Sequence, residues 1–179
     1  PTSIAAYSDT QIHPISVEDS VSAILRHESG IHGFIHVNTC DPSLESRLSI
    51  SCDKGRISLQ NGILTVETLP QSTREYSRMS NDDFAGQNGE AKQVRAPICG
   101  DYRKLLPLFY SNLAHALAGE APIEVSILDA VGQVDLGCAM LLSSARGRSV
   151  EFPVDAVEYD AFLQERYSEH TDTVESEPV

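Results

Sequence analysis

The chain has 179 residues, of which 41% are hydrophobic, and it carries a formal net charge of −13. This size and composition suffice for one buried core, so a single globular part is the first expectation. Nine acids and one base between Glu151 and Val179 give −8, which leaves −5 for the preceding 150 residues. This acidic balance argues against nucleic acid and anionic membrane as partners.

The four cysteines, Cys40, Cys52, Cys99 and Cys138, have neither CxxC spacing nor the Cys/His spacing of a metal site. We interpret them as reduced and mostly packed thiols rather than disulfides or metal ligands, which predicts a cytoplasmic protein. No apolar run approaches the about 20 residues that span a bilayer. The sequence also lacks a basic leader followed by an apolar stretch, so it shows no sign of a signal peptide.

The first part of the chain is expected to form strands. Thr2–Tyr7 predicts a short strand, and alternating apolar and polar residues then predict about five antiparallel strands between Asp19 and Leu69. Ser29-Gly30 and Asn61-Gly62 are turn sequences, of which Asn61-Gly62 is the strongest hairpin signal in the chain. The meander should have one apolar and one polar face.

The middle of the chain predicts a loop and a helix. Residues Pro70–Gly100 are polar and are expected to form a long loop, with a short extended piece near Gln93–Ala96. A helix is expected from Asp101, as its cap, to about Ala118. Pro107 lacks a backbone donor, so the helix either starts near Leu106 or bends at Pro107.

Ser126–Asp155 predicts a capped helix followed by a short strand over Ser149–Phe152. Ser126 with Asp129 resembles a capping box, and Gly147 suits a left-handed helix end. Apolar residues recur at helical spacing and should be buried, namely Val131, Val134, Ala139, Leu142 and Ala145. Strands followed by helices indicate the α+β class, with an open, largely antiparallel sheet covered by helices on one face.

The residues alone predict no catalytic, cofactor-binding or metal-binding site. Neither GxGxxG nor GxxxxGK[ST] occurs. His32 and His36 share a strand face but are too far apart to hold one metal without further ligands. We interpret them as polar surface residues, Ser143 and Ser144 as helix residues, and Asp129 as a helix cap rather than a general base.

Several stretches, taken together and in order, resemble the C-terminal domain of the Gfo/Idh/MocA oxidoreductases. Val17–Leu25 resembles the family strand VEDtasa.l.f, Ser29–Ile35 its nG..g.i hairpin, and Leu48–Leu59 its i.i.GtkG.l.l segment. Asn112–Pro122 resembles f..ai..gk.p, and Asp129–Phe152 resembles dg...lel..A...Sa..gr.v.lP. Cys52 departs from the family, which usually has glycine before this turn.

The resemblance implies that residues 1–155 are the substrate and oligomerisation domain, followed by a weak helix (156–167) and a disordered acidic tail. In this family an N-terminal Rossmann domain binds NAD or NADP, and its EKP and DxGxHxxD motifs supply the catalytic residues. None of these motifs occurs in this sequence. No catalytic residue is therefore carried over, and the missing Rossmann domain is an expected partner.

In the family the second face of the sheet commonly packs against another subunit. Polar residues that fit such a face include Ser22, Arg26, His32, His36, Arg47, Ser49 and Ser58. An ordinary solvated face is the alternative. The strand ends border the substrate in the family, so Asn38, Thr39 and Tyr102 are the expected substrate-lining residues.

The leading hypothesis is thus an inactive fragment of an enzyme, an NAD(P)-dependent oxidoreductase that acts on a sugar, a polyol or a similar small molecule. The alternative is a free-standing binding or dimerisation module of the same fold that has no catalytic role.

Overall fold

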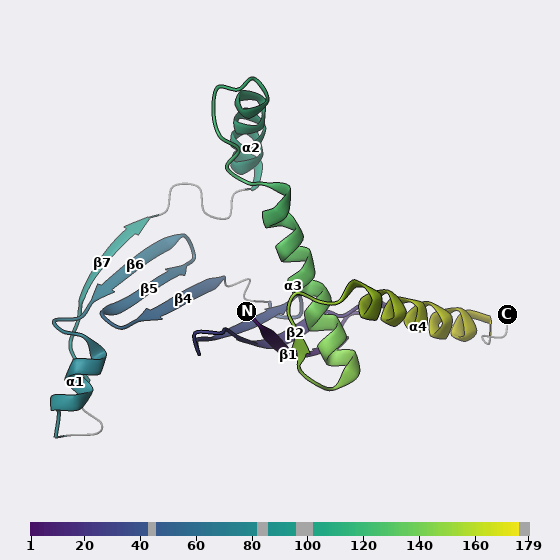
Figure 1. Cartoon of the computed structure of the whole chain (residues 1–179), viewed down its shortest axis with the longest axis horizontal. Helices are drawn as coiled ribbons and strands as arrows, with labels where there is room; N and C mark the ends of the chain where they lie inside the picture. The colour runs from purple at the N-terminus through teal and green to yellow at the C-terminus, as the bar shows by residue number, and fades with distance from the viewer. Residues whose placement is uncertain (43–45, 82–85, 96–101, 176–179) are drawn as a thin grey trace. The chain divides into compact units, whose positions relative to one another are not determined.

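The computed structural model describes residues 1–42, 46–81, 86–95 and 102–175 (Figure 1). The strands are β1 (Ser3–Asp9), β2 (Ser20–Arg26), β3 (His32–Asn38), β4 (Arg47–Cys52), β5 (Gly55–Gln60), β6 (Ile63–Thr68), β7 (Glu90–Arg95) and β8 (Val150–Glu151). The helices are α1 (Thr73–Met79), α2 (Tyr102–Leu117), α3 (Ile127–Arg146) and α4 (Ala156–Glu175).

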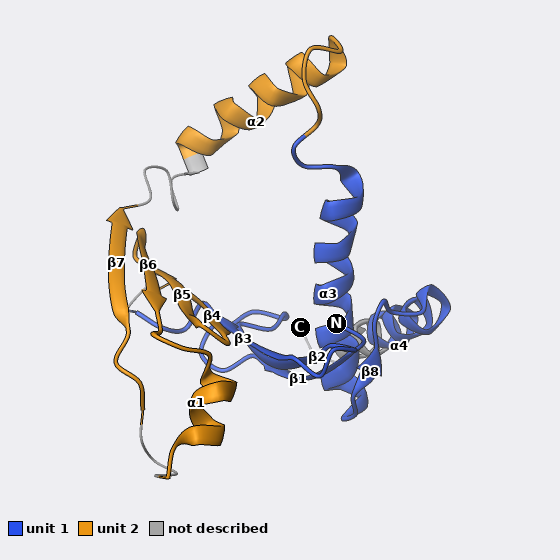
Figure 2. Cartoon of the chain, turned by 60° about the vertical axis from the view of Figure 1, so that its left-hand side comes forward, with its two compact units in different colours: residues 1–42, 124–179 blue, residues 43–123 orange. Residues whose placement is uncertain are grey.

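The chain forms two compact units, one made of residues 1–42 and 124–179 and the other of residues 43–123 (Figure 2). The first unit holds a four-stranded sheet of order β3-β2-β1-β8, and the second a four-stranded sheet of order β4-β5-β6-β7. All the pairings are antiparallel. The α+β class is confirmed, and the meander expected between Asp19 and Leu69 is divided between the two sheets.

The core of the first unit lies between α3 and one face of its sheet (Figure 1). Ile4 pairs with Leu25 and Ala6 with Ala23, so these four side chains point to the same face of β1 and β2. The buried apolar side chains are Ile4, Ala6, Ala23, Leu25, Ala139, Leu142, Val150 and Phe162. At about 25 cal/mol per Å² of apolar area, this burial is the main stabilising contribution to the unit.

Two serines of α3 complete the hydrogen bonding of β1. Strand β8 pairs with β1 only at Ser3 and Ile4. Beyond that point the N–H of Ala6 donates to Ser143 Oγ (2.9 Å), and the N–H of Ser8 donates to Ser144 Oγ (2.8 Å). Ser143 in turn donates to the carbonyl of Arg148 (2.7 Å). The hydroxyls thus satisfy buried backbone donors that a longer β8 would otherwise have paired.

The predicted caps of α3 are confirmed. Ser126 Oγ accepts from the N–H of Asp129 (3.3 Å), and the Asp129 carboxylate accepts from the N–H of Ser126 (2.9 Å). These reciprocal bonds form a capping box. Gly147 ends the helix in the left-handed region, with φ 60° and ψ 26°.

The predicted buried stripe of α3 is correct for two of its five residues. Ala139 and Leu142 are buried, but Val131 and Val134 are 48% and 65% exposed, and Ala145 is exposed too. Val131 and Val134 are exposed because only the C-terminal half of the helix packs across β1 (Figure 1). Helical periodicity gives the direction of an apolar face but not the length over which a sheet lies against it.

By length and composition alone, α3 is the one helix of the described residues that could cross a membrane. This differs from the expectation of no such apolar stretch. The core helix of a soluble protein meets the same criterion, and Leu142 and Ser143 pack against the sheet. The absence of a membrane partner stays a prediction.

Helix α4 continues to Glu175, beyond the end predicted at Tyr167. It is held to the first unit by Phe162, which is buried, and by three ion pairs. These are Arg146–Glu165 (2.7 Å), Arg148–Glu158 (2.6 Å) and Arg166–Glu18 (2.7 Å). The guanidinium groups of Arg146 and Arg166 both lie near the Phe162 ring, at 5.9 and 5.8 Å from its centroid.

In the second unit, alternation places most apolar side chains of the four strands on one face. Leu48, Leu59, Leu64 and Val94 form one row across it, and the row of Ile50, Ile57 and Val66 lies beside it. Asn61 and Gly62 have φ values of 51° and 76°, so the predicted hairpin turn is confirmed.

The region predicted as a long loop contains two further elements. Ser72 caps α1 by accepting from the N–H of Glu75 (3.3 Å), and β7 pairs with β6 over the stretch expected to be extended. Helix α2 begins by Tyr102 and includes Pro107, so it does not start near Leu106. The expected cap, Asp101, lies outside the described residues.

Replacing Ser143 by alanine should destabilise the first unit by about 1–3 kcal/mol, because the buried Ala6 N–H and the Arg148 carbonyl both lose their partner. Urea unfolding measures the loss. Ser168→Ala is the matched control, since this exposed hydroxyl bonds only a carbonyl of its own helix. Equal stability of the two variants would contradict the assigned role of Ser143.

Candidate functional site

The sheet of the first unit has an open face, defined by the side chains that point away from α3. Register places Tyr7, Ser22 and His36 in one row, Ala5, Ile24 and Phe34 in the next, and Ser3, Arg26 and His32 in a third. The predicted polar-face residues Ser22, Arg26, His32 and His36 are thus confirmed on one face. Arg47, Ser49 and Ser58 belong to the sheet of the second unit.

The centre of this open face is apolar rather than polar. Ile24, Phe34 and Tyr7 are 56%, 72% and 77% exposed. A shallow hollow of about 600 Å³ lies over this area, lined by Ser3, Ala5, Ile24, Arg26, His32, Gly33, Phe34 and Ser149. An exposed aromatic and aliphatic patch rimmed by charged and polar groups is typical of an interaction surface.

Two of the three predicted substrate-lining residues lie together. Asn38 ends β3, and Thr39 follows it with its N–H bonded to the carbonyl of Asp19 (2.9 Å). Tyr102 is the first residue of α2, in the other unit, and its side chain lies outside the described residues. The role of all three in substrate binding stays a prediction.

Asn38 is part of a chain of hydrogen bonds on the open face. Its Nδ2 lies 2.8 Å from His36 Nε2, and the other ring nitrogen of His36 lies 2.8 Å from Ser22 Oγ. Asn38 Oδ1 accepts from the N–H of Asp41 (2.8 Å). These contacts hold the Asn38 amide in one orientation at the end of β3.

Asp19 lies close to this chain of bonds and anchors a loop that precedes β2. Its buried carboxylate accepts from the backbone N–H groups of Gln11 (2.7 Å), Ile12 (3.0 Å) and His13 (2.9 Å). His13 Nδ1 lies 3.0 Å from the same carboxylate. The N–H groups of His13 and Gln11 hold the pKa of Asp19 well below its usual range, against the opposing effect of burial.

His13, Asp19 and Cys40 are a possible metal-binding group, because their ligand atoms lie within 4.8 Å of one another. The hydrogen bonds favour a structural role instead. The Asp19 carboxylate already accepts from three backbone N–H groups and is within bonding distance of a ring nitrogen. Burial and the neighbouring Asp19 raise the pKa of the Cys40 thiol, which disfavours the thiolate that a metal requires.

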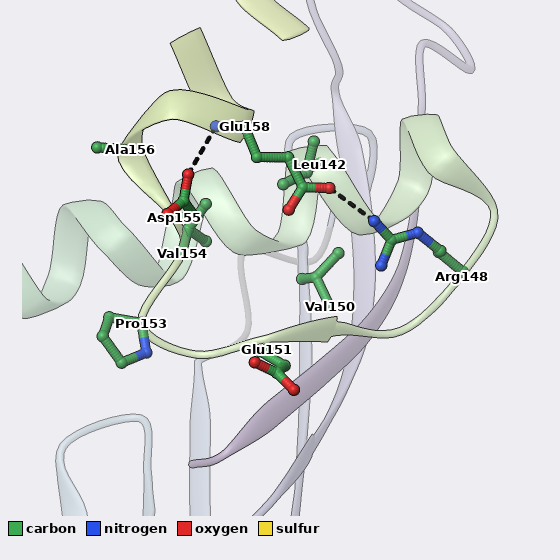
Figure 3. A pocket seen from close by; sticks show the side chains of 9 residues that line it. All are labelled: Leu142, Arg148, Val150, Glu151, Pro153, Val154, Asp155, Ala156 and Glu158. Carbon is green, nitrogen blue, oxygen red and sulfur yellow. Dashed lines mark hydrogen bonds and ion pairs between the residues drawn. The ribbon is translucent and has the colours of Figure 1, made fainter. Parts of the chain in front are cut away.

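A second hollow, of about 580 Å³, lies beside the start of α4 (Figure 3). Arg148 and Glu158 both line this hollow and form an ion pair at 2.6 Å. The Asp155 carboxylate accepts from the N–H groups of Val157 and Glu158, both at 2.9 Å. Three of the four charged side chains that line this hollow are thus already bonded within the protein, and the fourth is Glu151.

The sequence predicted none of the partners of Asp19. The only local signal is an acid placed just before a strand and after a polar loop with Pro14. His13 and Cys40 are separated from Asp19 along the chain, and only the return of β3 beside β2 brings Cys40 to it.

Part of the chain matches a known protein family. Residues 1–58 match the family model of the GFO/IDH/MocA C-terminal domain. The resemblance to the Gfo/Idh/MocA oxidoreductases is confirmed. The matched residues include β1 to β4, the Asp19 anchor and the Asn38 hydrogen bonds.

Several solved structures share the fold of the chain. The WlbA dehydrogenase from Bordetella pertussis is 21% identical, with a TM-score of 0.59, over 86% of this chain and 41% of that one. An oxidoreductase domain protein from Kribbella flavida is 14% identical, with a TM-score of 0.66, over 86% of this chain and 44% of that one. Levoglucosan dehydrogenase is 15% identical, with a TM-score of 0.64, over 86% and 45%.

The chain thus spans less than half the length of these structures. At such identities the likeness establishes the fold of the chain. No protein of curated function matches the sequence significantly.

The hydrogen bonds of Asp19 predict how the stability of the first unit depends on pH. Because the folded-state pKa is lowered, the stabilisation is complete above the ordinary carboxyl pKa of about 4 and is lost as the pH falls below it. Asp19→Asn should therefore be less stable at pH 7 and should lose less stability on acidification than the unchanged chain.

Urea midpoints between pH 7 and pH 3 measure this difference. Asp160→Asn is the control, because Asp160 is exposed on α4. Parallel pH profiles of the Asp19 variant and the unchanged chain would contradict the stabilising role of the Asp19 carboxylate.

Proposed function

We propose that this chain is the substrate-binding and oligomerisation domain of an NAD(P)-dependent oxidoreductase that acts on a sugar, a polyol or a similar small molecule. The family match over residues 1–58 carries the proposal. Among structures of the same fold, WlbA dehydrogenase is in complex with NADH and UDP-GlcNAcA, and levoglucosan dehydrogenase is in complex with NADH. These complexes support a nicotinamide cofactor and a sugar-like substrate for the complete protein.

The described residues of this chain do not fit the phosphates of such a cofactor. A dinucleotide site requires a glycine-rich turn that opens a helix, where the backbone N–H groups meet phosphate. Here the starts of α3 and α4 are capped by Asp129 and Asp155, whose carboxylates would repel phosphate. The cofactor, which supplies hydride transfer, is therefore assigned to a Rossmann domain of the complete protein.

The chain itself would then contribute substrate contacts and a subunit interface. Asn38 and Thr39, at the end of β3, are the proposed substrate contacts, with Tyr102 from α2. The amide of Asn38 can donate and accept hydrogen bonds, as recognition of a polyhydroxyl compound requires. The catalytic acid, base and cofactor groups would come from outside this chain, which is therefore inactive by itself. The free thiols of Cys40, Cys52 and Cys138 support a cytoplasmic location.

The reading frame upstream of Pro1 tests the assignment to an oxidoreductase. An EKP motif and a DxGxHxxD motif in that frame are the expected result. A start codon directly before Pro1 would contradict it and favour the free-standing binding module.

The open face of the first sheet is the proposed oligomer interface, since Phe34 and Ile24 expose apolar surface at its centre. A two-fold axis would place the same patch of two copies against each other. Light scattering should then give a mass above the 19.5 kDa of one chain, and Phe34→Glu should lower it to that value. Burying an unpaired carboxylate in the interface is costly.

Val157→Glu is the matched control, because Val157 is 77% exposed on α4, away from this face. A monomeric mass for the unchanged chain at high concentration would contradict the interface. Equal effects of the two variants would also contradict it.

A further inference from the structure

The hydrogen bonds of Asn38 determine which atoms of His36 carry protons. The backbone N–H of Asp41 can only donate, so the Asn38 atom that accepts from it at 2.8 Å is the carbonyl oxygen Oδ1. The atom of Asn38 that faces His36 is consequently the amide nitrogen Nδ2, which only donates. His36 Nε2, 2.8 Å away, must accept this bond and is therefore unprotonated.

The remaining proton of the neutral ring is then on Nδ1. Nδ1–H donates to Ser22 Oγ at 2.8 Å, which leaves the Ser22 hydroxyl proton directed elsewhere. The Nδ1–H tautomer is thus set by an unambiguous donor, the Asp41 backbone, acting through Asn38. It also means that His36 presents no basic nitrogen to Ser22, so the two do not form a nucleophile and its base.

We propose that His36 is a proton-sensitive latch that holds the Asn38 side chain and the turn after β3. A second proton on Nε2 would put an N–H against the Asn38 amide nitrogen, where two donors face each other. Rotating the amide so that Oδ1 meets the imidazolium would put its nitrogen against the Asp41 N–H. Protonated His36 and Asp41 cannot both be satisfied by Asn38, and one of the two bonds is lost.

The uptake of a second proton by His36 depends on the groups around the ring. Ser22 is its neighbour on β2. The charged or titratable groups of the same face and the adjoining turn are Tyr7, Asp9, Arg26, His32, Asp41 and Glu151. Helix α3 lies on the opposite face of the sheet and contributes no group to this side.

The change should be confined to the turn. Thr39 N–H and Cys40 Sγ both bond the Asp19 carbonyl, at 2.9 and 3.6 Å, and neither bond involves His36. When His36 is protonated, the Asn38 amide is released while the backbone stays attached to β2. Any effect of this release on substrate binding rests on the proposed function, because it requires that Asn38 contacts the substrate. The latch itself does not depend on the proposed function.

Nuclear magnetic resonance of the whole chain tests the latch without any substrate. At pH 8 the ring nitrogen shifts of His36 should be those of the Nδ1–H tautomer. Between pH 8 and pH 5.5 the Asp41 amide and the Asn38 side-chain amide should shift in step with the His36 ring. An Nε2–H tautomer at pH 8 would overturn the proposal, as would an Asp41 amide that does not respond to His36.

His36→Gln supplies the matched variant, because glutamine can accept from Asn38 and donate to Ser22 but does not titrate. In this variant the Asn38 and Asp41 signals should stay constant over the same pH range. His32→Gln is the control on the same strand and face, and it should leave the pH response of Asp41 unchanged. Loss of the response in His32→Gln alone would assign the switch to His32 and overturn the proposal. The tautomer measurement needs no variant, so it stands even if a variant does not fold.

Discussion

The first unit depends on how the free edge of β1 is completed. Strand β8 is two residues long, so the N–H groups of Ala6 and Ser8 on this edge of β1 would lack partners without α3. The hydroxyls of Ser143 and Ser144 bond these groups and bring α3 onto the sheet at the level of Ala6 and Ser8. A helix is thereby fixed in register with a strand by polar bonds, while Leu142 and Ile4 supply the apolar contact.

This attachment determines which face of the sheet is available for binding. Ala6 and Ala23 point toward α3, so the residues next to them on each strand point away. The Ile24–Phe34 patch and the Ser22–His36–Asn38 bonds therefore share the open face. The polar groups elsewhere are mostly bonded to one another. The Asp19 carboxylate accepts from loop N–H groups, and Arg148 is paired with Glu158. The first N–H groups of α3 and α4 are bonded to carboxylates of the same segments. The open face and the end of β3 are therefore the parts of the first unit that we propose for contact with a subunit and a ligand.

Local signals in the sequence were reliable where a few adjacent residues determine the structure. Ser126 with Asp129, Gly147 and Asn61-Gly62 predicted their caps and turn, since each depends on the conformation or hydrogen bonds of its own segment. The exposure of Val131 and Val134 was not predictable, because it depends on where the sheet ends. The same holds for the loop that proved to contain α1 and β7, and for the contacts of Asp19 with His13 and Cys40. Periodicity does not report such contacts between distant segments.

The central proposal is that this chain binds no nicotinamide cofactor by itself and is the second domain of an oxidoreductase. Calorimetric titration of the chain with NADH and with NADPH tests it most directly. The account predicts no binding heat with either cofactor, because carboxylates occupy the starts of α3 and α4 and the sequence has no glycine-rich phosphate loop. Binding with micromolar affinity would contradict it.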